Sequence, residues 1–277
     1  MTATTALLLA GGACTPGQQS GSDQPPPTVS TLIRDRPFYI AHRGGGGDWP
    51  ELTAYAYEQA AKLPGLRALE FSVCQTADGV LVCSHDKSTE RATGTPYVIA
   101  EQTWQTLSTL MVSARETNNP SQPAQPFTRF DDVIDRYVRD FVVFVEPKDK
   151  IAASNLMAKM ISLGQPERVV WKQPINSSLF ATAKQHGFGT WGYVLNEPGH
   201  LGDNLARFAA SSDIDMLGAP RAESDAFVAD IVAAADAHAK TTIMWEIRDV
   251  ADRARALRLG CAGQMTSHIA EVLAAPV

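Results

Sequence analysis

Four side chains that can move protons or bind cations stand at or beside the ends of short apolar runs. His42 follows FYIA, Glu70 lies within ALEFSV, His85 follows VLVCS, and Glu146 ends FVVFV. Two histidines suit a general acid and base pair. Two carboxylates from separate strands suit a hard divalent cation with oxygen ligands. This combination predicts phosphodiester cleavage, in which cations stabilise the charge on the phosphoryl oxygens.

Apolar runs alternate with amphipathic segments from residue 37 onward, which is typical of βα units and a parallel sheet. The predicted strands are 38–41, 68–73, 80–84, 141–146, 168–172, 190–195, 214–217, 241–247 and 261–266. The predicted crossover helices are 53–62, 130–137, 151–163, 177–185, 226–238 and 250–259.

Nine strands are one too many for an eight-stranded barrel. Asp78 and Gly79 form a favoured pair for a two-residue hairpin turn, so residues 80–84 would run back against 68–73. Eight parallel strands remain. We therefore expect an α/β fold, a TIM-type (β/α)8 barrel with an extra hairpin strand. Residues 87–126 would form an insertion or lid after the second barrel strand.

The predicted two-residue turn places Cys74 opposite Cys83 and Ser72 opposite His85. The cysteine pair falls at a position where the two strands come closest, so a disulfide is geometrically feasible. Two small buried thiols are the alternative, and both interpretations stay open. Cys261, inside the last strand, is expected to be a core residue.

Residues 1–36 read as an export signal followed by a disordered Gly/Gln/Ser/Pro tether, and residues 37–277 as one phosphodiesterase barrel. The stretch LAGGAC is similar to a lipobox, whose cysteine, here Cys14, would be lipidated and attach the chain to a membrane. Gly11 replaces the usual aliphatic residue there, and no basic residue precedes the apolar part. We expect an exported protein, as a cell-surface lipoprotein or a secreted or periplasmic protein.

The net charge of −6 and the pI near 5.5 argue against nucleic acid as a partner, because binding a polyanion needs a basic face. An anionic small-molecule substrate would instead need a local positive site.

The motifs resemble those of the glycerophosphodiester phosphodiesterases, whose superfamily includes the phosphatidylinositol phospholipase C-like phosphodiesterases. That family's pattern is H-R-G, P-E-N-T, E-x-D, T-x-D-G-x-x-V-x-x-H-D, R-x-T and E-x-K. In the same order this chain has HRG (42–44), PELT (50–53), EFS (70–72), TADGVLVCSHD (76–86), RAT (91–93) and EPK (146–148). The resemblance is strong from residue 38 to 148 and weaker beyond.

The resemblance implies a TIM barrel that hydrolyses glycerophosphodiesters to glycerol phosphate and an alcohol with a divalent metal, Ca²⁺ or Mg²⁺. It implies that the four glycines after Arg43 form a rim loop. They do not form a P-loop, which needs Gly-Lys-Ser/Thr. The implied roles are acid and base for His42 and His85, phosphate binding for Arg43 and Lys148, metal binding for Glu70, Glu146 and Ser72, and a pocket wall for Trp245.

Two residues depart from the pattern. Ser72 replaces the second carboxylate of E-x-D, and Leu52 replaces the Asn of P-E-N-T. A serine hydroxyl is a neutral and weaker ligand, so metal binding should be weaker or altered.

Three hypotheses remain open. The first is an exported, metal-dependent glycerophosphodiesterase with an altered site. The second is a cyclising, phospholipase-like enzyme with little need for metal, in which Arg43, Lys148 and the histidines provide the positive charge. The third is a catalytically silent surface lipoprotein that binds a phosphodiester or a cell-wall polymer.

Overall fold

The computed structural model describes residues 25–276. The predicted export signal and the predicted lipidation of Cys14 lie outside these residues. Within the described part, no helix combines the length and the apolar character needed to cross a bilayer.

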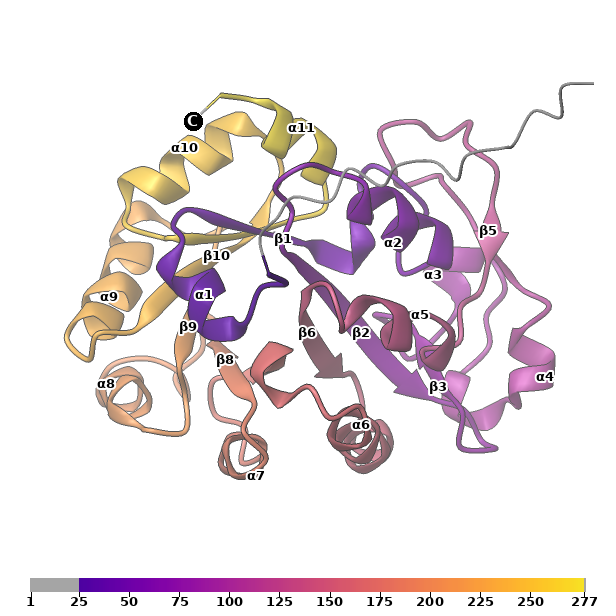
Figure 1. The fold of residues 1–277 in the computed structure, drawn as a ribbon, viewed down its shortest axis with the longest axis horizontal. Coiled ribbons are helices and arrows are strands. Elements are labelled where there is room, and N and C mark those ends of the chain that lie inside the picture. Colours follow the sequence, from indigo (N-terminus) through magenta and orange to yellow (C-terminus); the bar gives the residue numbers. More distant parts are fainter. Residues whose placement is uncertain (1–24, 277) are drawn as a thin grey trace, which may run out of the picture.

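Eight parallel strands close into a barrel, which confirms the predicted architecture (Figure 1). The first strand pairs with the last on one side and with the second on the other, and this pairing closes the sheet. The barrel strands are β1 (Phe38–Ala41), β2 (Ala68–Gln75), β6 (Val142–Pro147), β7 (Val169–Pro174), β8 (Gly189–Tyr193), β9 (Met216–Pro220), β10 (Thr241–Ile247) and β11 (Gly263–Thr266). The extra strand β3 (Leu81–Cys83) pairs antiparallel with β2, as predicted.

Helices surround the barrel (Figure 1). They are α2 (Ala54–Ala61), α5 (Asp131–Tyr137), α6 (Lys150–Ser162), α7 (Phe180–Gln185), α8 (Asp203–Ala210), α9 (Asp225–Asp236), α10 (Val250–Arg258) and α11 (Ile269–Ala274). Several begin at a capping side chain that accepts a hydrogen bond from the first turn, among them Thr53, Asp149, Ser224 and Asp249. The sequence predictions did not include α8 and α11.

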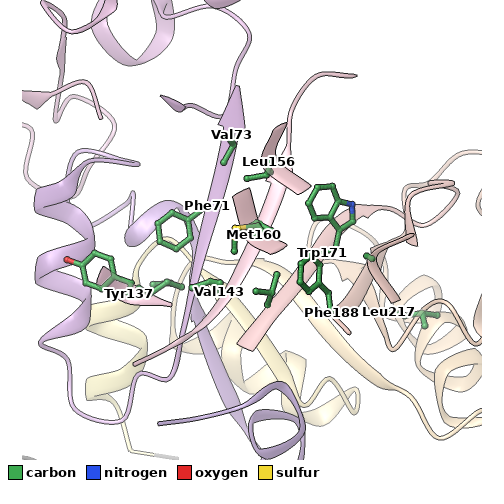
Figure 2. Close-up of a cluster of buried hydrophobic side chains, with 14 of the residues drawn as sticks. Phe71, Val73, Tyr137, Val143, Leu156, Met160, Trp171, Phe188 and Leu217 are labelled. Carbon is green, nitrogen blue, oxygen red and sulfur yellow. The ribbon is translucent and has the colours of Figure 1, made fainter. Parts of the chain in front are cut away.

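Successive side chains of each strand point alternately outward and inward. The barrel therefore has an outer core, between strands and helices, and a separate interior. Phe71 and Val73 of β2 point outward and join the cluster between strands and helices (Figure 2). Ala68 belongs instead to the cluster inside the barrel. Glu70 and Ser72 lie on the same inward face as Ala68, nearer the carboxyl end of the strand. The strand periodicity therefore directs these polar side chains into the barrel mouth.

A short helix, α1 (Val29–Arg34), lies across one end of the barrel (Figure 1). Thr28 caps it, and its Leu32 is fully buried among the inward side chains of the strands. Arg36 also donates a hydrogen bond of 2.8 Å to Thr241 Oγ1. The predicted disordered tether up to residue 36 therefore differs from the structure, because an apolar residue of this segment fills the end of the barrel.

The hairpin loop between β2 and β3 contains three residues, 77–79, and not the predicted two. Thr76 N donates to Val80 O at 2.9 Å, and Gly79 completes the loop at φ +84°. A three-residue loop of this kind needs a left-handed position, which glycine adopts without strain. The predicted register is therefore wrong by one residue.

The shift separates the two cysteines that could have formed a disulfide. Cys74 lies opposite Val82, and Cys83 lies opposite Val73. Cys74 packs into the core of the insertion, whereas Cys83 packs into the outer barrel core. Because a slip of one residue turns side chains to the opposite face, the two sulfurs cannot meet. Both thiols are free and buried, as is Cys261.

The insertion predicted at residues 87–126 forms a small unit beside β2 and β3. It contains α3 (Glu90–Thr93), α4 (Trp104–Leu107), β4 (Met111–Val112) and β5 (Gln125–Pro126), with one short 3-10 turn at Ile99–Glu101. It has an apolar core of its own. Asn118 N donates to Gly47 O at 2.7 Å, and Gln122 Nε2 donates to Asp48 O at 2.7 Å. The insertion is thus joined to the glycine loop at the rim of the mouth.

Candidate active site

A lysine that the sequence analysis did not single out lies between the two buried glutamates. Lys172 Nζ is 2.9 Å from Glu70 Oε1 and 2.8 Å from Glu146 Oε2. The three residues are at most 5% exposed. Lys148 Nζ lies 3.0 Å from Glu146 Oε1, and Tyr193 OH donates to the same oxygen at 2.9 Å. Two carboxylates and two ammonium groups therefore form one charge-balanced cluster.

The remaining contacts of Glu70 come from the first two strands. Ser72 Oγ donates to Glu70 Oε1 at 2.9 Å, and Arg43 N donates to Oε2 at 2.8 Å. Burial alone would raise the pKa of Glu70, but the charge of Lys172 holds it far below its usual range. At Glu146, burial likewise favours a higher pKa, but the charges of Lys172 and Lys148 outweigh it. The pKa of Glu146 is therefore also lowered. Conversely, the two carboxylates raise the pKa of Lys172 despite its burial. All three groups are charged at neutral pH.

A chain of ion pairs connects His85 to Arg43. His85 Nδ1 lies 2.7 Å from Asp86 Oδ1, and Arg91 Nε donates to Asp86 Oδ2 at 2.5 Å. Arg91 also bonds to Glu51, which accepts from Arg43 Nη1 at 2.9 Å. Because Asp86 accepts the hydrogen of Nδ1, the other ring nitrogen of His85 carries the lone pair.

The surroundings of His85 favour its neutral form. Burial, together with the positive charges of Arg43 and Lys148, lowers its pKa to about 4, against the opposing hydrogen bond to Asp86. The one-residue register shift places Ser84 opposite Ser72, so His85 lies one position beyond the predicted partner.

His42 is held by groups from the last two strands. Its Nδ1 lies 3.0 Å from Ser267 Oγ and 3.4 Å from Glu246 Oε1. Ser267 in turn donates to Glu246. Burial would raise the pKa of Glu246, but bonding to His42 and Ser267 holds it well below its usual range. Both histidines thus have a carboxylate near Nδ1, Glu246 for His42 and Asp86 for His85.

Arg43 has an unusual backbone and an unused donor. It lies at φ 54°, between the short β1 strand and the positive-φ residues Gly44 and Gly45. Its Nε is buried and has no hydrogen-bond partner among residues 25–276. A buried guanidinium group with a free donor is suited to bind an anion.

A groove of about 670 Å³ opens beside the cluster, at the carboxyl ends of β6, β7 and β8. Its lining includes Glu146, Lys148, Gln173, Asn176 and Tyr193. Trp245 packs edge-on against Tyr193, with ring centroids 5.4 Å apart, so it borders the mouth through this tyrosine. The groove is large enough for a small polar ligand.

The arrangement does not fit the predicted divalent metal. Glu70, Ser72 and Glu146 do lie together, but the Lys172 ammonium stands between the two carboxylates. Throughout residues 25–276, no group of three or more His, Cys, Asp or Glu side chains is arranged to hold a metal ion. We therefore derive no catalytic step through a metal.

Sequence reasoning missed Lys172, Tyr193 and Glu246. Each is a polar residue near the carboxyl end of a predicted strand, which is the criterion that identified Glu146. Applied to the second half of the chain, this criterion finds all three.

Comparisons with known proteins identify the family of this chain. Residues 42–198 match the sequence profile of the glycerophosphoryl diester phosphodiesterase family. The chain belongs to this family. A glycerophosphodiester phosphodiesterase of Bacillus subtilis is 25% identical over 147 residues, which cover 51% of this chain and 50% of that protein. One of Arabidopsis thaliana is 37% identical over 87 residues, covering 31% and 23% respectively. The matched segments thus span half or less of these relatives.

Solved structures of family members share the fold. The Thermotoga maritima glycerophosphodiester phosphodiesterase has a TM-score of 0.68 and 18% identity, covering 84% of this chain and 95% of that one. The Oleispira antarctica phosphodiesterase, solved in complex with its product sn-glycerol-3-phosphate, has a TM-score of 0.67 and 18% identity. That match covers 88% of this chain and 98% of the other. At this identity the likeness establishes the barrel alone.

Proposed function

We propose that this chain hydrolyses glycerophosphodiesters to glycerol phosphate and an alcohol at the carboxyl end of its barrel. The observation that carries the proposal is the pair of histidines at the mouth. Each has Nδ1 engaged, His85 with Asp86 and His42 with Ser267, and neither Nε2 has a partner within residues 25–276. Two oriented rings with free Nε2 atoms suit proton transfer at a substrate.

The substrate phosphate binds between the two positive side chains at the mouth. Arg43 offers its unpartnered Nε, and Lys148 offers an ammonium that borders the groove. Both charges stabilise the negative charge that builds up on the phosphoryl oxygens during displacement. The alcohol part of the substrate lies in the groove.

The low pKa of His85 assigns it the role of base, which leaves the role of acid to His42. His85 is neutral at pH 7, so its Nε2 removes a proton from the attacking water while the new bond to phosphorus forms. His42, whose Nδ1 is held by Ser267, gives a proton to the leaving oxygen as the old bond breaks. Exchange with solvent restores both protonation states.

The proposal is supported by the similar proteins of Arabidopsis thaliana and Bacillus subtilis, which are named glycerophosphodiester phosphodiesterases. The product named for the Oleispira antarctica structure is the product proposed here.

The test is release of glycerol phosphate by the full chain from a set of glycerophosphodiesters that includes glycerophosphocholine. Each assay is run with Ca²⁺, with Mg²⁺ and with EDTA. We expect His42→Ala and His85→Ala to lose about 10²- to 10⁴-fold in kcat/KM. His238→Ala, an exposed histidine outside the site, serves as the matched control and should retain turnover.

Near-normal turnover by either site variant would contradict the assignment. If the folded wild-type protein releases product from no phosphodiester under any condition, the binding-protein hypothesis replaces the enzyme.

A further inference from the structure

Lys172 occupies the position in which two facing carboxylates would otherwise share a cation. Its Nζ lies within hydrogen-bond distance of both Glu70 and Glu146, and it also lies 5.6 Å from the centre of the Trp191 ring. The aromatic face and the two carboxylates all favour a positive charge at this point.

Every carboxylate oxygen of the pair already has a donor. Glu70 Oε1 accepts from Lys172 and Ser72, and Glu70 Oε2 accepts from Arg43 N. The Glu146 oxygens accept from Lys172 on one side and from Lys148 and Tyr193 on the other. A metal ion could bind these oxygens only by displacing protein donors.

The charges lead to the same conclusion. Glu70 and Glu146 contribute two negative charges, and Lys172 and Lys148 contribute two positive charges, so the cluster is balanced without a metal. A divalent ion between the carboxylates would lie beside the Lys172 ammonium and repel it. Ser72, next to Glu146 in register, adds no third carboxylate to offset this repulsion.

We propose that Lys172 is a built-in cation that takes the place of a divalent metal in this site, so that the proposed phosphodiester cleavage needs no metal. This inference rests on the proposed function. Lys172 acts as a positioning residue that holds both carboxylates, and through them the Arg43 backbone and the Lys148 ammonium. Two of the three N–H groups of its ammonium are used in this way.

The first experiment measures metal binding and does not depend on turnover. The full chain is titrated with Ca²⁺ and with Mg²⁺ by calorimetry, beside Lys172→Met combined with Ser72→Asp. We expect no site-specific binding by the wild type and about one ion per chain in the double variant. Lys148→Met combined with Ser72→Asp is the matched control: it also removes one ammonium but leaves Lys172 in place, so it should not bind.

Two results would overturn the inference. One is stoichiometric metal binding by the wild type that is lost in Glu70→Gln. The other is a folded Lys172→Met/Ser72→Asp variant that binds no metal. Because removing Lys172 leaves two buried carboxylates less well paired, circular dichroism checks each variant. The wild-type titration decides even if a variant does not fold.

The second experiment uses the phosphodiester assay. Wild-type turnover should be unchanged by EDTA. Lys172→Met should lose about 10²- to 10³-fold, Lys172→Arg should keep part of the activity, and Ca²⁺ should restore activity to Lys172→Met/Ser72→Asp. Loss of wild-type turnover on chelation would reject the inference. Absence of all turnover would instead reject the proposed function, and the titrations would still decide whether Lys172 excludes a metal.

Discussion

The two imidazoles at the mouth of the barrel lie in different electrostatic surroundings. His85 lies near the positive charges of Arg43 and Lys148 as well as the carboxylate of Asp86, whereas His42 lies near the carboxylate of Glu246. The neutral form of His85 is the one that the proposed role of base requires. These four charged groups come from four different strands or loops.

The titration of His85 tests this account directly. Because burial and nearby cations disfavour the imidazolium, we expect an NMR midpoint at about pH 4. The ring is then neutral above that pH, and activity that needs it as a base falls as the pH drops through the midpoint. Lys148→Met removes one of the cations, so the midpoint should rise toward 6.5.

Lys184→Met provides the control, because this lysine pairs with Asp215 away from the mouth. It should leave the His85 midpoint unchanged. A wild-type midpoint near 6.5 would show that the neighbouring charges do not act as described.

At the scale of elements, the loop after β1 holds a residue in a conformation that its side chain disfavours. Leu52 is buried and lies at φ 57°, the left-handed region. Its amide donates to Arg43 O at 2.9 Å, which fixes the loop against the site. The Asn of the family pattern stands at this position, and Asn is among the non-glycine residues that most often adopt this conformation.

The left-handed conformation of Leu52 predicts that the usual order of stability, in which alanine is more stable than glycine, does not hold at this position. Leu52→Ala should cost about 2–5 kcal/mol of unfolding free energy through lost burial. Leu52→Gly should be at least as stable as Leu52→Ala, by up to about 1 kcal/mol, because glycine relieves the positive φ. Urea unfolding measures both variants.

Leu205, which is buried in helix α8, is the control position for comparing alanine with glycine. In this helix, glycine should be about 1 kcal/mol less stable than alanine. The same order at both sites would mean that the loop conformation carries no strain.

The elements also show what the sequence could reveal. Strand positions followed from apolar periodicity, because each buried strand of a barrel needs an apolar outer face. The β2–β3 register did not follow, because a loop of two residues and a loop of three fit the same Asp-Gly signal. Only the hydrogen bond between Thr76 and Val80 decides between them. The disulfide prediction failed with the register.

The site was predictable where a motif marked it. His42, Arg43 and Glu146 stand in motifs of the first half, and the structure brings them together. Lys172 and Glu246 stand in no motif, and their importance arises from partners far away in the sequence. Lys172 contacts a glutamate 102 residues away. A buried charge of this kind can be recognised from its position at a strand end, but its partner cannot.

At the scale of the whole molecule, α1 completes the core from outside the barrel sequence. Leu32→Ala should destabilise the protein by about 2–5 kcal/mol, because the buried side chain fills the barrel end. Arg34→Ala, an exposed neighbour, should have little effect.

A chain that begins at Pro37 should show a lower urea midpoint than the full chain. Equal midpoints would mean that α1 contributes nothing to stability.

The closure of the barrel by its first strand has a consequence for synthesis. β1 lies between β2 and β11, and His42 depends on Glu246 and Ser267 from the last two strands. A nascent chain can therefore form most of its sheet while one edge of β1 stays unpaired. At that stage His42 still lacks its contacts with Glu246 and Ser267. The proposed pair of histidines assembles only when the final strand leaves the ribosome, so we expect incomplete chains to lack the proposed phosphodiester cleavage.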